Sequence, residues 1–441
     1  MTRRLPLAAP SRGVPVELSV AGATVRGFTG ESVAAAALAG GAQVMSRSLK
    51  YHRPRSAFCL EGHCGGCLMR IEGIPNRRAC QTPCHAGLRA ESQNAFPSAE
   101  LDVLGAVDFV FARGLDHHTL MTGSAIMNLM ANRVVRQLSG LGTLPAVAAS
   151  ELPQVGEHHV DVAVIGGGAA GLCAARATAA AGARTLLIDD QLAFGGSLRA
   201  DPRHGAPAAD KAHAQAQAAG VTFLPRTTAI GYFPEDAGGV LVAASETQLH
   251  RVVAREWIWA TGGYPVLLPV ADNDRPSVLA LRAAGRLLEE HGILAGGVIC
   301  VLTHPRMRED AEATAAALRD AGAEVTVIPA AEAQAVLGRR GVRGVRLGDG
   351  RRVDCDTVLM ASVPSPATEG ARQQGCDVVL DETGGGFCLV VDEHGRTTVP
   401  HVWGCGDVCG YRGPGAAAAH GQAVGEHVAR ALASELSKAV P

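Results

Sequence analysis

Four cysteines near the N-terminus have the spacing of a metal-cluster ligand set. Cys59, Cys64, Cys67 and Cys80 follow the pattern C-x4-C-x2-C-x12-C. A plant-type 2Fe–2S cluster takes four thiolates, three of which come from one tight loop. Structural zinc sites usually use two C-x2-C pairs, and this segment has one. The spacing therefore favours a 2Fe–2S cluster over the alternatives, a zinc site or a set of buried free thiols.

The surroundings of these cysteines fit a cluster as well. Gly62, Gly65 and Gly66 stand between the cysteines, where the absence of a Cβ lets backbone N–H groups approach sulfur. Residues 1–90 hold 12 Lys and Arg against 4 Asp and Glu, a net charge of +8, whereas the whole chain of 441 residues has a net charge of −2. An oxidised cluster with four thiolates carries a charge of about −2, so a basic first module suits it.

Two residues near the four cysteines are expected to play no part in ligation. Cys84 lies four residues after Cys80, and a free cysteine there is most simply a small buried hydrophobe. His63 stands inside the ligand loop, and we expect it to face solvent.

A glycine-rich segment follows an apolar strand predicted at 160–165. Residues 166–171 read GGGAAG and satisfy G-x-G-x-x-G between this strand and a predicted helix that ends near Ala181. A helix N-terminus offers unpaired N–H groups to a pyrophosphate. We expect Gly166 to make the turn, Gly168 to admit the phosphate and Gly171 to allow helix and strand to pack.

An acidic residue ends the next predicted strand, 185–188. Asp189 lies eighteen residues after Gly171, where a carboxylate accepts hydrogen bonds from ribose hydroxyls and disfavours a 2′-phosphate. The side chain of the adjacent Asp190 should point the other way, because side chains alternate along an extended strand.

Two later segments narrow the dinucleotide to FAD. Residues 260–263 (ATGG) end a strand and residues 402–407 (VWGCGD) precede the last helix. They resemble the second and third signatures of flavoproteins with two dinucleotide-binding domains, in which the G-D aspartate binds the ribityl chain. The predicted FAD-binding residues are Gly166, Gly168, Ala169, Ala170, Gly171, Asp189, Ser197, Thr261, Gly262, Gly406 and Asp407.

A second strand–helix–strand unit is predicted at 298–302, 309–321 and 324–328. Its first turn, residues 303–308, has no glycine and contains Pro305, so the close approach of a nicotinamide dinucleotide is disfavoured. Arg306 and Arg308 remain possible phosphate contacts. Residues 191–200 contain no cysteine, which argues against disulfide reductase activity.

The elements that must position these residues form an α/β protein. Hydrophobic residues make up 47% of the chain, and the 54 glycines suit many tight strand–helix turns. The N-terminal part predicts a hairpin (15–28), a helix (31–42) and a strand (68–72), the layout of a β-grasp ferredoxin. Other strands are predicted at 221–224, 229–233, 240–244 and 257–260, and a long helix at 416–432.

These elements predict four regions. Residues 1–140 form a 2Fe–2S ferredoxin-like domain with a helical extension, 141–158 a linker, 159–265 with 390–441 an FAD-binding domain, and 266–389 a degenerate NAD(P)-type domain. The fold class is thus a β-grasp domain followed by a Rossmann-like flavoprotein fold with two dinucleotide-binding domains.

The whole set resembles the α subunits of heteromeric flavin-dependent amine and amino-acid dehydrogenases and oxidases, which include sarcosine oxidase, opine and hydroxyproline dehydrogenases and hydrogen cyanide synthase. Residues 48–55 (SLKYHRPR) and 91–97 (ESQNAFP) resemble strings of the sarcosine oxidase α subunit. That α subunit also carries a C-terminal folate-binding domain, which this chain lacks.

The resemblance implies an electron-transfer subunit. In that family a β subunit oxidises the amine at its own flavin, and a second flavin, often FMN, lies at the interface of the two subunits. The catalytic residues of this chain are unknown, since His52, His117 and His118 are candidates by residue type alone and are expected to be structural or surface histidines. Lys50, Arg53 and Arg55 form a candidate interface with the partner or its flavin phosphate; the alternative is an ordinary charged surface.

Two other functions remain open from the sequence: a stand-alone NAD(P)H-dependent reductase with a fused ferredoxin, which the turn at 303–308 disfavours, and a scaffold with degenerate cofactor sites. No run of about 18 apolar residues occurs, so no membrane span is expected. We expect a cytoplasmic location and no nucleic-acid partner.

Overall fold

The structure is a computed structural model that describes residues 3–5, 13–48, 52–105, 126, 153–234 and 239–439. Contacts divide the chain into two compact units. The first comprises the described parts of Met1–Ala148, Leu267–Leu302 and Leu318–Met360, and the second those of Ala149–Val266, Thr303–Ala317 and Ala361–Pro441.

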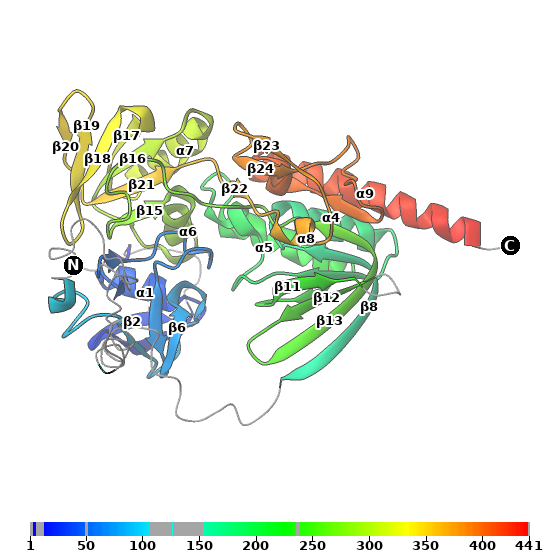
Figure 1. Ribbon diagram of the computed structural model, residues 1–441, viewed down its shortest axis with the longest axis horizontal. Coiled ribbons are helices and arrows are strands. Elements are labelled where there is room, and N and C mark those ends of the chain that lie inside the picture. Colours follow the sequence, from blue (N-terminus) through cyan, green and yellow to red (C-terminus); the bar gives the residue numbers. More distant parts are fainter. Residues whose placement is uncertain are drawn as a thin grey trace. The chain divides into compact units, whose positions relative to one another are not determined.

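The first unit contains a five-stranded sheet of order β2-β1-β7-β5-β6 (Figure 1). Its strands are β1 (Pro15–Val20), β2 (Ala23–Phe28), β5 (Leu68–Ile71), β6 (Ile74–Arg78) and β7 (Arg89–Glu91). The hairpin at 15–28 and the strand at 68–72 are as predicted. Two further short strands, β3 (Ser46–Arg47) and β4 (Pro54–Arg55), pair with each other.

One helix of the first unit, α1 (Val33–Ala39), is buried along its whole length and contacts β2. It is shorter than the predicted 31–42. The Oγ of Ser32 accepts the Ala35 N–H at 3.2 Å, so the helix begins after this cap, and it ends at Gly40. Its alanines permit close packing because each buries little volume.

The first unit also holds most of a second sheet, of order β15-β21-β16-β17. Its strands are β15 (Val278–Ala280), β16 (Val298–Thr303), β17 (Glu324–Pro329) and β21 (Thr357–Ala361), and a smaller sheet contains β18 (Ala333–Gly338), β19 (Val342–Leu347) and β20 (Arg352–Val353). Phe58 packs against this core, and its carbonyl accepts the N–H of Ala280 at 3.0 Å. Helix α6 (Leu281–His291) follows β15 directly.

The second unit is built on a seven-stranded sheet in which β10-β9-β8-β13-β12-β11 are successive neighbours and β25 also pairs with β13 (Figure 1). Its strands are β8 (Gln154–Ile165), β9 (Thr185–Ile188), β10 (Thr222–Leu224), β11 (Thr228–Phe233), β12 (Val240–Ala244), β13 (Gln248–Trp259) and β25 (Val402–Gly404). Four smaller strands are β14 (Gly263–Tyr264), β22 (Ser365–Pro366), β23 (Val378–Asp381) and β24 (Gly386–Leu389).

Two helices of this unit pack against each other, α4 (Ala169–Ala180) and α9 (Pro414–Ala439). A Cβ at Gly421 would lie 2.1 Å from the carbonyl oxygen of Ala170, so only glycine allows this approach. The remaining helices are α5 (Gly205–Ala218), α7 (Arg308–Asp320) and α8 (Glu369–Gln373).

The structure changes two predicted boundaries. Residues 154–158, expected in the linker 141–158, belong to β8, because β8 pairs in parallel with β13 from Gln154 opposite Gln248 to Ile165 opposite Trp259. The rest of that linker, up to residue 152, lies outside the described residues. The region 266–389, expected as one domain, is divided between the two units, because its first sheet shares a core with Phe58.

None of the helices in the described part of the chain is long and apolar enough to span a bilayer.

Candidate functional site

The four predicted cysteine ligands come together in the first unit. Cys59, Cys64 and Cys67 lie in the loop between β4 and β5, and Cys80 lies in the short 3₁₀ turn Ala79–Gln81 after β6. The Sγ atoms of Cys59 and Cys64 are 3.3 Å apart, and the Cys80 thiol is within hydrogen-bond distance of both Cys59 and Cys67. Three of the four side chains are buried and Cys64 is half-buried.

The loop backbone favours the thiolate form of at least one of these cysteines. The N–H groups of Glu61 and Cys64 both donate to the Sγ of Cys59 at 3.4 Å. Hydrogen bonds from the Cys64 and Cys80 side chains lower the pKa of the Cys59 thiol; burial opposes them, and the two N–H groups lower the pKa further.

Two glycines are required for this loop shape. Gly62 has a φ of +78°, which L-residues rarely adopt, and a Cβ at Gly66 would lie 2.1 Å from the carbonyl oxygen of Ser56. The residues present therefore fit a group that needs four close thiolates and backbone donors.

The thiols contact one another in a chain, Cys64 to Cys59 to Cys80 to Cys67, and not around one point. Among the residues that the structure describes, no three His, Cys, Asp or Glu side chains have the arrangement of a single-ion site. A closed tetrahedral zinc site would need one. A binuclear cluster instead takes two thiolates at each iron, which a chain of pairwise contacts can supply.

Cys84 and His63 occupy the places expected of them. Cys84 is 4% exposed, and burial, followed by the charge of Glu31, raises the pKa of its thiol to about 12. A thiol with so high a pKa is a poor ligand and behaves as a small apolar group. His63 is exposed.

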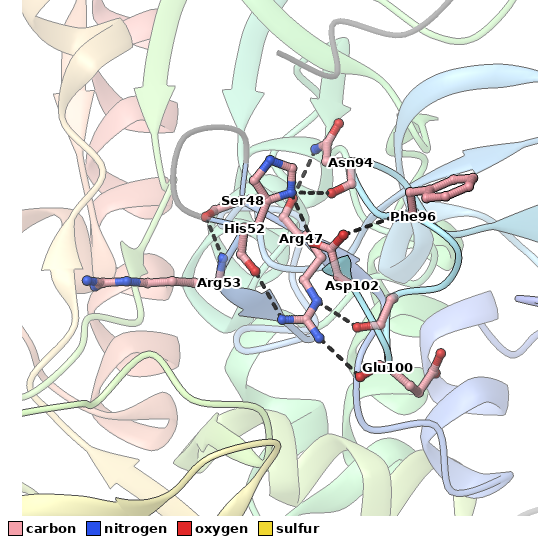
Figure 2. Close-up of polar contacts among 9 residues, drawn as sticks. Arg47, Ser48, His52, Arg53, Asn94, Phe96, Glu100 and Asp102 are labelled. Atoms are coloured by element: carbon pink, nitrogen blue, oxygen red, sulfur yellow. Dashed lines mark hydrogen bonds and ion pairs between the residues drawn. The ribbon is translucent and has the colours of Figure 1, made fainter. Parts of the chain in front are cut away.

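His52 is a structural histidine in the first unit (Figure 2). Its ring is 3% exposed, and its Nδ1 lies 2.9 Å from the Asn94 carbonyl oxygen and 3.0 Å from Oδ2 of Asp102. Both partners are acceptors, so Nδ1 carries the hydrogen. Arg47 donates to the carbonyl oxygens of His52 and Glu100 and thereby holds the strands β3 and β4 in place.

The candidate interface cations are differently placed. Arg53 is exposed, whereas the Nη1 of Arg55 pairs with Oδ2 of Asp274 at 3.0 Å, within the first unit. Half-exposed pairs of this kind contribute little stability, but the pairing lowers the net positive charge that Arg55 can offer. Lys50, His117 and His118 lie outside the described residues.

The predicted dinucleotide cradle lies in the second unit, between β8 and α4. A Cβ at Gly166, where φ is +106°, would lie 2.3 Å from the Ala260 carbonyl oxygen, and one at Gly171 would lie 1.8 Å from the Gly166 carbonyl oxygen. A Cβ at Gly168 would meet nothing within 4 Å. Two glycines thus serve packing, and the third borders open space at a helix N-terminus, where a pyrophosphate fits.

Asp189 lies against this glycine loop. Its Oδ2 accepts the Gly167 N–H at 2.5 Å and its Oδ1 accepts the Gln191 N–H at 2.9 Å. A carboxylate has about four acceptor positions, so these bonds orient the group and still leave capacity for ribose hydroxyls. The exposed side chain of Asp190 instead accepts from Nε2 of Gln191, as expected for a residue that faces the other way.

The other predicted FAD residues surround the same helix start. Ser197 lies in the 3₁₀ turn Gly196–Ala200, and a Cβ at Gly196 would be 3.0 Å from the Cα of Gly168. Gly406 approaches Ala170, with 2.7 Å from an added Cβ to the Ala170 Cβ. Thr261 and Gly262 follow the Ala260 carbonyl that contacts Gly166, and buried Asp407 accepts the N–H of Arg412 at 2.9 Å.

One residue near this site was not predicted. The Nδ1 of His420, on α9, accepts the Gly406 N–H at 3.1 Å. Burial, followed by the charge of Arg412, lowers the pKa of His420 to about 4. A lone histidine in an alanine-rich helix gives no sequence signal for this contact.

The turn at 303–308 does not fit a nicotinamide dinucleotide. As predicted, it contains no glycine; His304 caps a 3₁₀ turn, Pro305–Met307, in which its Nδ1 accepts the Arg306 N–H at 3.3 Å. The first turn of α7 carries two carboxylates, Glu309 and Asp310, which would repel a phosphate at that helix start.

Three family models match parts of the chain. They are described as 2Fe-2S iron-sulfur cluster binding domain (residues 13–95), FAD dependent oxidoreductase (161–263) and pyridine nucleotide-disulphide oxidoreductase (297–423). The first covers all four cysteines and the second covers the glycine-rich cradle, in agreement with the two predicted cofactors.

Two curated proteins are similar to the chain over long segments. The sarcosine oxidase subunit alpha of Rhizobium meliloti (strain 1021) is 31% identical over 320 residues, which cover 66% of this chain and 32% of that protein. The protein of the same name from Corynebacterium sp. (strain P-1) is 29% identical over 434 residues, covering 90% of this chain and 40% of that protein. The chain thus spans less than half of the length of these relatives.

A solved structure shares the fold. The L-proline dehydrogenase from P. horikoshii superposes with a TM-score of 0.74 at 18% sequence identity, over 98% of this chain and 76% of that chain. The predicted fold class, with an N-terminal 2Fe–2S domain and an FAD-dependent dinucleotide-binding fold, is confirmed. The chain belongs to the homologues of the sarcosine oxidase α subunit and carries an iron–sulfur cluster binding domain and FAD-dependent oxidoreductase domains.

Proposed function

We propose that the chain is the electron-transfer subunit of a multi-subunit flavoprotein that oxidises a secondary amine or an amino acid of the sarcosine, proline or opine kind. One observation carries this proposal: a single chain gathers four thiols in one glycine-containing loop and builds an open dinucleotide cradle at Gly168. Two relatives that are named subunit alpha support a role within a complex.

We assign each cofactor to the residues that fit it. The proposed ligands of a 2Fe–2S cluster are Cys59, Cys64, Cys67 and Cys80. The proposed FAD site comprises Gly166, Gly168, Ala169, Ala170, Gly171, Asp189, Ser197, Thr261, Gly262, Gly406 and Asp407. When bound, FAD exchanges two electrons and the cluster one, so the pair can convert a two-electron oxidation into single-electron steps.

The residues of the chain bind and orient these groups. The N–H groups that donate to Cys59 stabilise negative charge on sulfur, and the start of α4 offers N–H groups to the pyrophosphate of FAD. Asp189, already aligned by two backbone N–H groups, is placed to accept from the ribose.

The amine-oxidising site is proposed to lie on a β subunit with its own flavin, and an FMN at the interface between the subunits is part of the same proposal. His52 is engaged by Asp102 and Asn94, which leaves it as a structural group and not a general base. We further propose a cytoplasmic location, because all twelve cysteines are free thiols.

Reconstitution tests this function. The chain alone should not oxidise sarcosine, proline, hydroxyproline or an opine with a dye acceptor, whereas co-expression with the β subunit should give turnover that is lost in Cys64→Ser. Turnover by the isolated chain would overturn the subunit role. Rapid NADH oxidation by the isolated chain would favour the stand-alone reductase instead.

A further inference from the structure

The first turn of α7 is tied to two loops of the proposed FAD site by an ionic network within the second unit. Arg203 donates to both carboxylate oxygens of Asp201, at 2.8 and 2.6 Å, and also pairs with Asp310. The hydroxyl of Tyr411 donates to the other carboxylate oxygen of Asp310. Asp310 thus joins the segment after Ser197 to the segment after Asp407.

Additional contacts hold the same segments. The Nη2 of Arg306 donates to the Tyr411 carbonyl oxygen at 3.2 Å, and the N–H of the next residue, Arg412, donates to Asp407. Arg306 is therefore committed to a protein carbonyl and not to a phosphate. Asp310 is 19% exposed and Asp201 is 6% exposed, so these charges are shielded enough for their geometry to be well defined.

The charges of the network favour this arrangement. Burial works against the charged form of Asp201, but the Arg203 guanidinium and N–H hold the pKa of this carboxyl below its usual range. Hydrogen bonding to Asp201, and then to Asp310, raises the pKa of Arg203. A carboxylate in the first turn of a helix is also stabilised by the helix dipole, and Asp310 occupies that position in α7.

We propose that Asp310 is a positioning residue for FAD: in the place where a dinucleotide-binding domain would hold the phosphates of NAD(P), this chain has a carboxylate that clamps the loops carrying Ser197 and Asp407. The inference rests on the proposed FAD site. It assigns the NAD(P)-type segment a role in flavin binding and no nucleotide of its own.

Titration of the apo-protein with FAD, followed by flavin fluorescence, tests this role. Asp310→Asn should bind FAD about tenfold more weakly, the effect of one charge-assisted hydrogen bond, and Tyr411→Phe should shift the Kd in the same direction. Asp310→Glu should restore part of the affinity. Glu312→Gln removes the same charge from an exposed position of α7 and should leave the Kd unchanged.

A second readout separates positioning from general stability. The visible circular dichroism of bound flavin should change in Asp310→Asn and Tyr411→Phe, since it reports how the ring is held, but not in Glu312→Gln. NADH should show no saturable binding to the wild-type apo-protein. If Asp310→Asn does not fold, Tyr411→Phe decides the question alone.

The outcomes are distinct. An unchanged FAD Kd and flavin spectrum in both network variants, or saturable NADH binding, overturns this inference while the FAD site stands. Absence of FAD binding by the wild-type chain overturns the proposed function and this inference together.

Discussion

The Nδ1 of His420 accepts the backbone N–H of Gly406 at 3.1 Å, which joins helix α9 to the segment that carries Asp407. Only a ring with an unprotonated Nδ1 can accept this bond. The pKa of His420 is lowered from 6.5 to about 4 by burial and by Arg412, so the ring is neutral at pH 7.

This contact predicts an acid-sensitive FAD domain. A histidine whose pKa is lower in the folded state than in the unfolded state contributes full stability above about pH 6.5 and loses it as the pH falls toward 4. After allowance for solvent screening, we expect about 1 kcal/mol of lost stability between pH 7 and pH 5. Denaturant unfolding at a series of pH values measures it.

The control for this prediction is His420→Gln, whose amide oxygen can accept the same N–H without titrating. It should reduce the loss between pH 7 and pH 5 by that amount. An identical pH profile in the variant and the wild type would show that His420 does not cause the acid sensitivity.

The cysteine site predicts about two irons and two acid-labile sulfides per chain. Cys64→Ser should lose the cluster or shift its absorption, because a hydroxyl is a poorer iron ligand than a thiolate, while flavin content stays constant. Cys84→Ser removes another thiol of the same unit and should keep the iron. Stoichiometric zinc without charge-transfer bands would refute the cluster.

Asp189 predicts a selective effect on flavin affinity. Asp189→Ala removes a charge-assisted hydrogen bond to ribose together with the alignment of the Gly167 N–H, and FAD binding should weaken by about 1.5–3 kcal/mol. Isothermal titration of the apo-protein measures the change. The neighbouring Asp190→Ala is the matched control, and equal effects of the two substitutions would contradict the assignment.

Two glycines of the same motif predict opposite phenotypes. Gly171→Ala places a Cβ 1.8 Å from the Gly166 carbonyl oxygen and should destabilise the FAD domain by several kcal/mol, about 3 or more. Gly168→Ala meets no protein atom within 4 Å and has an ordinary φ of −74°, so it should fold normally and lose FAD affinity. Thermal melting and FAD titration of both variants separate the two effects, and a stable, FAD-tight Gly168→Ala would argue against a pyrophosphate at this position.

Local sequence signals were sufficient for the parts of the site that depend on short segments. The cysteine spacing and the glycine motif each lie in one strand–turn segment, and the structure places their side chains as those segments require. The strands β9 and β12 also match their predicted ranges, because each is a short apolar run between polar turns.

Contacts between distant segments could not be predicted in this way. The first half of β8 is polar on its surface and becomes a strand only because β13 extends beside it, ninety-four residues later by register. The bonds of His420 to Gly406 and of Asp310 to Arg203 and Tyr411 join segments that are far apart in sequence. No local pattern marks such partners, since each side chain alone looks like an ordinary surface residue.

The central claim is that one chain holds both FAD and a 2Fe–2S cluster, and an anaerobic reductive titration of the purified chain tests it most directly. With both groups bound, the chain should take up about three electrons, two by the flavin and one by the cluster, and the reduced cluster should give an electron paramagnetic resonance signal that Cys64→Ser lacks. Uptake of about two electrons with no such signal in the wild-type chain would contradict the account.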